Sequence, residues 1–364
     1  MPPADEQPPA SAAAPQEVVD RAFGAENRAR LLDQYFEQAG AVTTANAWQH
    51  VYRLLLWIDR TTALAHCYES DKAQPGRAWY ARSLAFHDWV STQLHVPPAG
   101  LAETIDWLFR EAVKDLAARA VAGRSAAYER QRAPYAGRGF PEPGDRKLAA
   151  ILREALGRWM TVEPPANELL ALTLRIHAHL GQENKRKNLV GEGFEDVIAA
   201  VMRRLPFASG VKIRTRVPLH DLPGFNPPLP TGKVKKVDLA LVAGNARTLV
   251  TAKWSIRADR EEQFMSDFQA YARLESAGHD FGYALITNEF DAARLKAACE
   301  GRRENALLFT HVVHINPAAV ELVYRDEHAK GAAALRAHIA NGRLMSLQAW
   351  LESAGASRPL TASR

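Results

Sequence analysis

One acid and one amine interrupt two neighbouring apolar segments of this chain. Asp238 lies within the segment 235–242, and Lys253 follows the apolar run of the segment 248–255. Both segments have the length and the Val/Leu/Ala content of buried β-strands, where an unpaired charge is costly. On adjacent strands the two side chains would supply a Mg²⁺ ligand and a cation beside a phosphate, which is the chemistry of a metal-dependent phosphodiesterase. A purely structural ion pair between the strands is the alternative that these two residues alone leave open.

A segment suited to reading bases follows Lys253 after three residues. It has the sequence Arg257-Ala258-Asp259-Arg260 and lies where an amphipathic helix is expected to begin. Each arginine can donate two hydrogen bonds to the edge of a guanine, and Asp259 can accept from cytosine amino groups. The segment therefore predicts base contacts at G·C pairs.

Together these residues resemble a known family of nucleases. Asp238 with Thr251-Ala252-Lys253 is similar to the PD-(D/E)XK signature, and the tract 252–260 with Asp267 resembles type II restriction endonucleases that cut sites containing CCGG, most of all the BsaWI-like members. In that branch the acid expected two residues before the lysine is displaced onto the next helix, and a hydroxyl residue takes its place. Thr251 fits this departure, although serine is the usual form. The resemblance covers roughly residues 188–325.

Helical periodicity places the displaced acid. Phe264, Phe268, Tyr271 and Leu274 recur at the spacing of one helix face, and Asp267 falls on that face. Glu261 and Glu262 fall mainly off the face and are expected to be solvated. A carboxylate on a core-facing stripe needs a partner, which a metal site would supply. A helix acid at the edge of the stripe is the alternative.

A second helical acid, Glu195, borders an apolar stripe that begins at Phe194. Its neighbour Asp196 is expected to point away from the stripe. In nucleases of this fold a glutamate on the first helix often lines the metal site, and Glu192 is the fallback. The alternative for Glu195 is an acid that simply stabilises the first turn of a helix.

These parts predict a division of roles. Asp238, the backbone carbonyl of Ala252 and Asp267 would hold Mg²⁺, with Glu195 in support. Lys253 would orient the attacking water and stabilise negative charge on the phosphate in the transition state.

Composition is compatible with DNA as the partner. The chain has 364 residues, a formal net charge of +5 and 47% hydrophobic residues, enough for two domains with large cores. Among the basic residues near the proposed site, Lys233, Lys235 and Lys236 are the expected phosphate contacts. Two cysteines are too few for a disulfide framework or a cysteine zinc site. No apolar run of transmembrane length or signal sequence is evident, so the expected location is the bacterial cytoplasm.

The order of predicted elements gives an α/β protein. Residues 1–16 are expected to be a disordered tail, 17–182 a helical N-terminal domain, and 183–364 a PD-(D/E)XK catalytic and DNA-recognition domain with a C-terminal helical segment. The catalytic domain is expected to be a mixed β-sheet flanked by helices. Its predicted strands are 211–217, 235–242, 248–253, 281–287, 307–315 and 320–324, its predicted helices begin near 191, 260 and 291, and the last helical segment covers about 331–353. The loop 218–232 holds five prolines and is a candidate DNA contact.

The resemblance implies a type II restriction endonuclease. Such an enzyme makes Mg²⁺-dependent double-strand cuts in palindromic DNA containing CCGG and leaves 5′ extensions. A symmetric site implies a homodimer or higher homo-oligomer, and a companion methyltransferase would act on the same site. Two alternatives stay open: a structure-specific or repair nuclease with the same core, and a non-catalytic DNA-binding or assembly protein.

Overall fold

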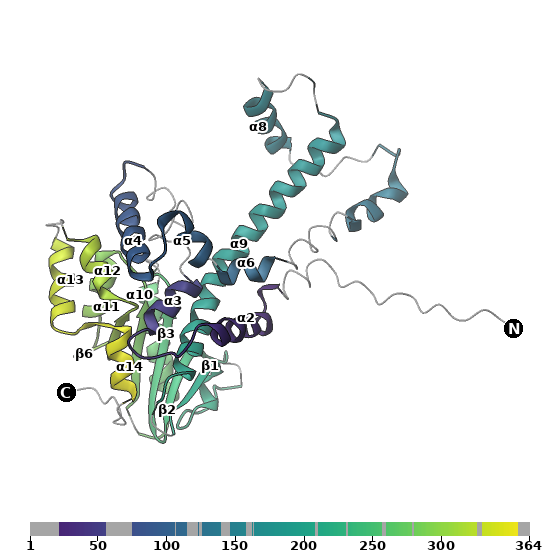
Figure 1. The fold of residues 1–364 in the computed structure, drawn as a ribbon. Helices are drawn as coiled ribbons and strands as arrows, with labels where there is room; N and C mark the ends of the chain where they lie inside the picture. Colours follow the sequence, from purple (N-terminus) through teal and green to yellow (C-terminus); the bar gives the residue numbers. More distant parts are fainter. Residues whose placement is uncertain are drawn as a thin grey trace. The chain divides into compact units, whose positions relative to one another are not determined.

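The computed structural model confirms a mixed β-sheet flanked by helices (Figure 1). It describes residues 22–55, 75–105, 107–114, 123, 126–139, 146–157, 162, 164–207, 210–230, 232–256, 260–278, 280–325 and 330–355. The predicted tail, 1–16, lies outside these residues. None of the described helices is both long and apolar enough to cross a membrane.

Six strands form the sheet in the order β1-β2-β3-β4-β7-β8. Their bounds are β1 Lys212–Pro218, β2 Lys236–Ala243, β3 Ala246–Lys253, β4 Gly282–Thr287, β7 His311–His314 and β8 Leu344–Ser346. The first three strands pair antiparallel, and the remaining neighbours pair parallel. A two-residue turn of Gly244 and Asn245 joins β2 to β3, and Gly244 has the positive φ of 59° that such hairpin turns require.

Helices connect and cover the parallel half of the sheet. The sheet unit contains α10 Arg260–Leu274, α11 Ala292–Glu300, α12 Pro317–Val323, α13 Lys330–Ala340 and α14 Leu347–Gly355, and a short hairpin of β5 Arg302–Arg303 and β6 Ala306–Leu307. All six residues of β4 are buried, as expected for a parallel strand covered on both faces. Phe264, Phe268 and Tyr271 of α10 are buried, which confirms the predicted inward face of this helix.

By packing, the chain divides into two compact units. One comprises Met1–Leu31 and Phe109–Leu189, and the other comprises Leu32–Leu108 and Val190–Arg364. The boundary predicted near residue 182 falls within one helix, α9 Ala166–Arg203. The sequence predicted that a new helix begins near residue 191, and this was wrong, because α9 runs through this position without a break. Gly181 and Gly191 weaken the helix but, unlike proline, do not break it.

Part of the predicted N-terminal helical region packs in the same unit as the sheet. It contains α3 Ala47–Leu55, α4 Ala78–Leu94 and α5 Pro98–Ile105, preceded by α2 Ala25–Gln38 and followed by α6 Trp107–Val113. The Tyr52 hydroxyl donates to Asn288 Oδ1 at 2.9 Å, and the rings of Phe86 and Phe290 lie 4.7 Å apart. These contacts hold α3 and α4 against the segment that follows β4.

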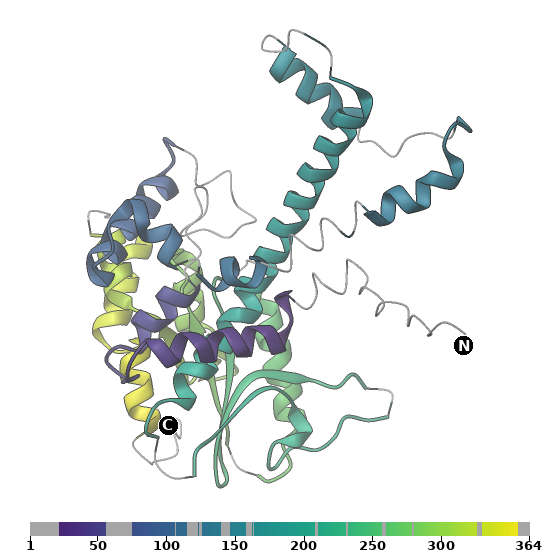
Figure 2. The ribbon, with the colours of Figure 1, turned by 45° about the vertical axis from the view of Figure 1, so that its right-hand side comes forward.

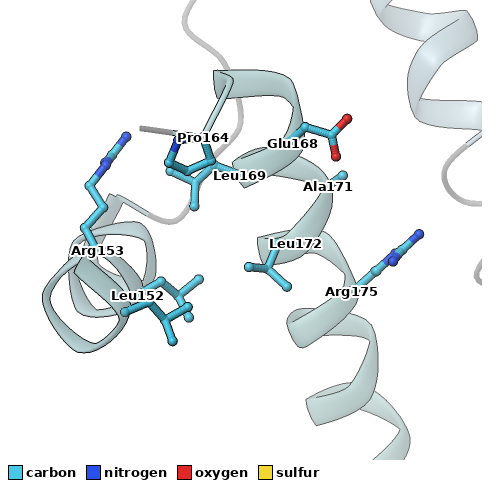
Figure 3. Close-up of a pocket in the computed structure, with 9 residues that line it drawn as sticks. Leu152, Arg153, Pro164, Glu168, Leu169, Ala171, Leu172 and Arg175 are labelled. Atoms are coloured by element: carbon cyan, nitrogen blue, oxygen red, sulfur yellow. The ribbon is translucent and has the colours of Figure 1, made fainter. Parts of the chain in front are cut away.

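The other unit contains η2 Ala133–Tyr135, α8 Arg146–Leu156 and the first part of α9. Between α8 and α9 lies a small hollow of about 320 Å³, which Figure 3 shows to be lined largely by leucines such as Leu152 and Leu172. None of the predicted catalytic residues lines it.

Two predictions near the C-terminus were wrong. The predicted strand 320–324 lies largely in helix α12, because Asn316 caps the helix by accepting from Ala318 N at 3.1 Å and Pro317 occupies the first turn. The segment 331–353, predicted to be helical throughout, contains strand β8 between α13 and α14. A strand of three residues is too short to show a period-2 pattern.

The proline-rich loop between β1 and β2 extends beyond the strands and is anchored at its base (Figure 2). The short helix η4 (Leu219–Asp221) begins the loop, and Leu219 N donates to Lys235 O at 2.9 Å. The buried Arg247 of β3 donates to the carbonyls of Pro223 and Gly224 at 3.0 and 3.3 Å. A Cβ at residue 224 would overlap the Arg247 guanidinium, so glycine is required there.

Candidate active site

Asp238 of β2 is the centre of a hydrogen-bonded group. Its Oδ2 accepts from Lys253 Nζ at 2.6 Å, from the Ala252 backbone N–H at 3.1 Å and from Thr251 Oγ1 at 3.2 Å. The register explains the group, because Leu239 pairs with Val250 and the next position places Asp238 opposite Thr251. The structure thus brings together four residues that the sequence assigned to the site.

A second carboxylate approaches the same lysine. Glu195 of α9 is buried, and its Oε1 lies 3.6 Å from Lys253 Nζ. Burial and the charge of Asp238 raise the pKa of Glu195 to about 7, although Lys253 and Arg216 act in the opposite direction. Burial, followed by the charge of Asp238, therefore disfavours the ionised form of Glu195.

Arg216 is a site residue that the sequence reasoning did not single out. It lies opposite Asp238 in the register of β1 and β2, and its backbone has a positive φ of 46°. Its Nη1 is 3.1 Å from Glu195 Oε2, and its Nη2 pairs with Asp196 Oδ1. A non-glycine residue in this left-handed region is strained, and such strain is concentrated at functional sites.

Asp196, expected to point away from the apolar stripe of its helix, nevertheless reaches the same arginine as Glu195. Its side chain is largely buried, with 13% exposed, and shares the Arg216 guanidinium with Glu195. The backbone carbonyl of Glu192, the fallback acid, accepts from Arg216 at 3.4 Å, while the Glu192 side chain belongs to an exposed residue. The alternation of Lys212, Arg214 and Arg216 on β1 is a sequence signal for a basic strand face, but it does not indicate the left-handed turn at Arg216.

Asp267 forms an ion pair with a different lysine, Lys235. Its Oδ1 lies 2.8 Å from Lys235 Nζ, and its Oδ2 accepts from Gln263 Nε2 at 3.5 Å. After burial, the charges of Asp267 and Asp238 both raise the pKa of Tyr271, so the two carboxylates act on the same buried phenol. Asp267 is near the Asp238 group, and its role in metal binding stays a prediction.

Of the predicted base-reading segment 257–260, the structure describes Arg260. Arg260 begins α10 and donates to Gln263 Oε1, which links it through Gln263 to Asp267. Arg257 and Asp259 lie outside the described residues. Of the predicted phosphate contacts, Lys233 and Lys236 are exposed, whereas Lys235 is the partner of Asp267.

The oxygen atoms of this group are ligands of the type that a hard cation such as Mg²⁺ prefers. Within the described ranges, no group of three or more His, Cys, Asp or Glu side chains is arranged to hold a metal ion. Mg²⁺ commonly takes only one or two carboxylates and keeps several waters. Asp238 and Glu195 could supply these carboxylates. The Ala252 carbonyl lies on the β2 side of its strand, since the N–H of the same residue donates to Asp238. The raised pKa of Glu195 indicates that another positive charge would be favourable there.

Comparisons with known proteins give one structural likeness. Neither a protein-family model nor a curated protein sequence matches the chain. A solved structure described as a restriction endonuclease PspGI–substrate DNA complex is similar, with 10% sequence identity and a TM-score of 0.35 over 94% of this chain and 91% of that chain. At this degree of likeness, function has to be argued from the residues of the site.

Proposed function

We propose that this protein is a Mg²⁺-dependent endonuclease of the type II restriction class that cuts double-stranded DNA. The observation that carries the proposal is the ion pair of Asp238 and Lys253 on adjacent strands, with the buried Glu195 on the same lysine. A structural ion pair needs one acid and one base. Here a second acid approaches the same ammonium and has its pKa raised to about 7, an arrangement that costs stability and is typical of functional sites.

Each residue has a role in this proposal. Asp238 and Glu195 would hold Mg²⁺ together with the Ala252 carbonyl, and Asp267 would support the site from α10. Bound Mg²⁺ supplies a Lewis acid that polarises the phosphate and activates water. Lys253 would orient the attacking water and stabilise the developing negative charge, and Thr251 would fix Asp238 through its hydroxyl.

The proposed substrate is palindromic double-stranded DNA containing CCGG, cut to leave 5′ extensions. Arg257, Asp259 and Arg260 would read the bases, and the exposed Lys233 and Lys236 would contact phosphates. Reading a palindrome requires at least a homodimer, and a methyltransferase of the same specificity would protect the DNA of a bacterial cytoplasm that contains the enzyme.

Digestion of a sequenced plasmid with purified protein tests the proposal. We expect fragments only when Mg²⁺ is present, with every end at CCGG and with 5′ extensions. Ends scattered over many sequences or confined to branched DNA would support a structure-specific nuclease. DNA binding without any cutting would support the non-catalytic alternative.

Binding measurements test the base-reading segment separately from the chemistry. Arg260→Ala should weaken binding to a CCGG duplex by roughly tenfold or more relative to a duplex without CCGG, because a bidentate arginine–guanine contact discriminates by about 1–3 kcal/mol. Lys236→Ala should weaken both equally and reduce the salt dependence. Equal losses for both duplexes with Arg260→Ala would make this arginine a phosphate anchor and remove it from CCGG recognition.

A further inference from the structure

A second hollow lies at the end of the sheet where the parallel strands begin. Its volume is about 1230 Å³, and its lining includes Asp280, Thr310 and Arg343, which lie just before β4, β7 and β8, respectively. Gly282, the first residue of β4, pairs with Thr248 of β3, and Lys253 lies five residues further along β3. Five residues of strand correspond to roughly 17 Å. The hollow is therefore separated from the Asp238 group by nearly the length of the strand.

Three arginines line this hollow without a carboxylate partner among the described residues: Arg302, Arg303 and Arg343. The hydrogen bonds of the Arg343 guanidinium go to backbone carbonyls, at 2.7 Å to Cys299 and 3.4 Å to Thr310. Within the described part of the chain, Arg303 Nε and Arg343 Nη2 are buried and have no hydrogen-bond partner. A buried cation without a counter-charge is unfavourable, so an anion in this hollow would relieve the cost.

The guanidinium groups are held in place before any ligand arrives. Arg303 stacks on the ring of Phe268 at 4.0 Å, and Arg343 is fixed by its two carbonyl acceptors. Arg302 and Arg303 form strand β5 of a short hairpin whose turn includes Glu304 with a positive φ of 50°. Groups fixed in this way lose little conformational entropy when they bind a ligand.

The acids of the hollow do not balance these charges. Glu300 lies 3.7 Å from Lys296 Nζ and 3.1 Å from His338 Nε2, so its charge is already engaged. Asp280 is the other acid of the lining, and it belongs to an exposed residue. His338 Nδ1 is a further buried ring nitrogen without a partner in the described structure, and whether it donates or accepts depends on the tautomer of the ring. The balance of the lining is cationic and rich in N–H donors.

We propose that this hollow is a binding site for a phosphate-bearing ligand, separate from the nuclease site. Guanidinium forks match the oxygens of phosphates and carboxylates, because each can donate two parallel hydrogen bonds, and three guanidinium groups around one hollow suit the several oxygens and charges of a phosphate-bearing ligand. The volume of about 1230 Å³ leaves room for a ligand larger than inorganic phosphate. The phosphates can belong to a free nucleotide or polyphosphate, or to the backbone of a nucleic acid.

Calorimetric titration of the full-length protein with inorganic pyrophosphate tests the site. Metal ions are left out, and NaCl keeps the ionic strength constant. We expect binding by the wild type and a loss of affinity of about tenfold or more with Arg303→Gln and with Arg302→Gln. Arg273→Gln is the matched control, because this exposed arginine of α10 lies outside the lining, and it should change affinity by less than about twofold.

Two further measurements distinguish the possible sources of the phosphate and the two sites at which it could bind. In the first, a short DNA duplex is titrated into the same variants. If the arginine variants lose affinity for pyrophosphate alone, the natural ligand is a free phosphate compound. If they also lose affinity for the duplex, the ligand is the phosphate backbone of a nucleic acid. Lys253→Gln should leave pyrophosphate binding unchanged. Thermal melting checks folding, and the exposed Arg302 keeps the test valid if Arg303→Gln unfolds the protein.

The proposal is overturned if pyrophosphate fails to bind the wild type and the duplex binds both arginine variants normally. It is also overturned if pyrophosphate affinity falls with Lys253→Gln and not with the arginine variants, since the anion would then occupy the catalytic end. Neither result depends on cleavage, so the outcome is independent of the nuclease proposal.

Discussion

The two ends of the sheet carry opposite kinds of charge imbalance. Where β3 ends, Glu195 and Asp238 approach one lysine, and burial and repulsion raise the pKa of Glu195 to about 7. Where β4, β7 and β8 begin, Arg303 and Arg343 line a hollow without carboxylate partners among the described residues. One end would gain from a cation and the other from an anion. The same sheet thus positions two clusters with opposite charge imbalances, which we propose to serve two sites of different chemistry.

The largest expected effect comes from removing the charges at the Asp238 end. Asp238→Asn and Lys253→Ala should each lower Mg²⁺-dependent cleavage by at least about a thousandfold, since one removes the proposed metal ligand and the other the cation proposed to lie beside the phosphate. Lys253→Ala should still bind cognate DNA, because phosphate and base contacts lie mostly elsewhere. Plasmid cleavage and binding without metal measure the two properties. Wild-type cutting by either variant would show that the catalytic assignment is mistaken.

A smaller effect is expected from Arg216, which holds the two acids of α9. Arg216→Gln should reduce cleavage by roughly a hundredfold, because Glu195 and Asp196 lose their shared hydrogen-bond donor and their orientation. Arg214→Gln on the same strand is the matched control, since Arg214 is exposed. Arg216→Lys should recover part of the activity. If Arg214→Gln and Arg216→Gln lose equal activity, a general loss of positive charge explains both.

The buried His314 lies in the same row of the sheet as Lys253, and it allows a comparison with a neutral buried group. It lies two strands from Lys253 in register, through Thr287. Burial lowers the pKa of His314 to about 4, and its ring is satisfied as a neutral group by Glu289 O and Asn316 N, both at 3.1 Å. Between about pH 6.5 and 4 the unfolded chain therefore binds the proton more readily, so stability falls as the pH is lowered through this window.

Denaturant unfolding at pH 7 and pH 4.5 measures this contribution. His314→Gln should reduce the acid-induced loss of unfolding free energy by about 2 kcal/mol relative to the wild type. An acid-induced loss of the same size in both proteins would remove His314 as its source.

The smallest expected effect compares two acids of α10. Asp267→Ala should lower cleavage by about tenfold relative to Glu262→Ala, because Asp267 is largely buried beside Lys235 and Glu262 is exposed. The comparison lies within one helix, so helix propensity does not account for a difference. Equal cleavage rates would exclude Asp267 from the site and leave it as a structural partner of Lys235.

The sequence predicts those features that repeat along the chain. Alternating or continuous apolar runs located β2, β3 and β4, and the spacing of Phe264, Phe268 and Tyr271 located the buried face of α10. The grouping of Asp238 with Lys253 follows from two strands joined by a two-residue turn, which is a local property. These parts require no knowledge of distant contacts.

Features set by distant contacts or single residues were missed. Strand β8 has three residues and is defined by pairing with β7. Arg216 has a left-handed backbone within a strand, which no pattern of residue types predicts. The strand predicted at 320–324 failed because the β-branched Val320 and Val323 favour a strand locally, whereas the cap at Asn316 and Pro317 in the first turn decide for the helix.

The anchoring of the proline-rich loop has a consequence for the entropy of binding. Arg247 ties Pro223 and Gly224 to β3, and Asn226 N donates to Leu274 O at 2.7 Å. The Lys235 carbonyl closes the other side of the loop, so the part of the loop beyond these anchors lies between Asn226 and Lys235. Fixing the backbone of one residue costs about 1–2 kcal/mol, and the fold has already met that cost at the base of the loop. A partner that contacts the exposed Lys233 therefore orders a short segment, and more of the contact energy remains as affinity.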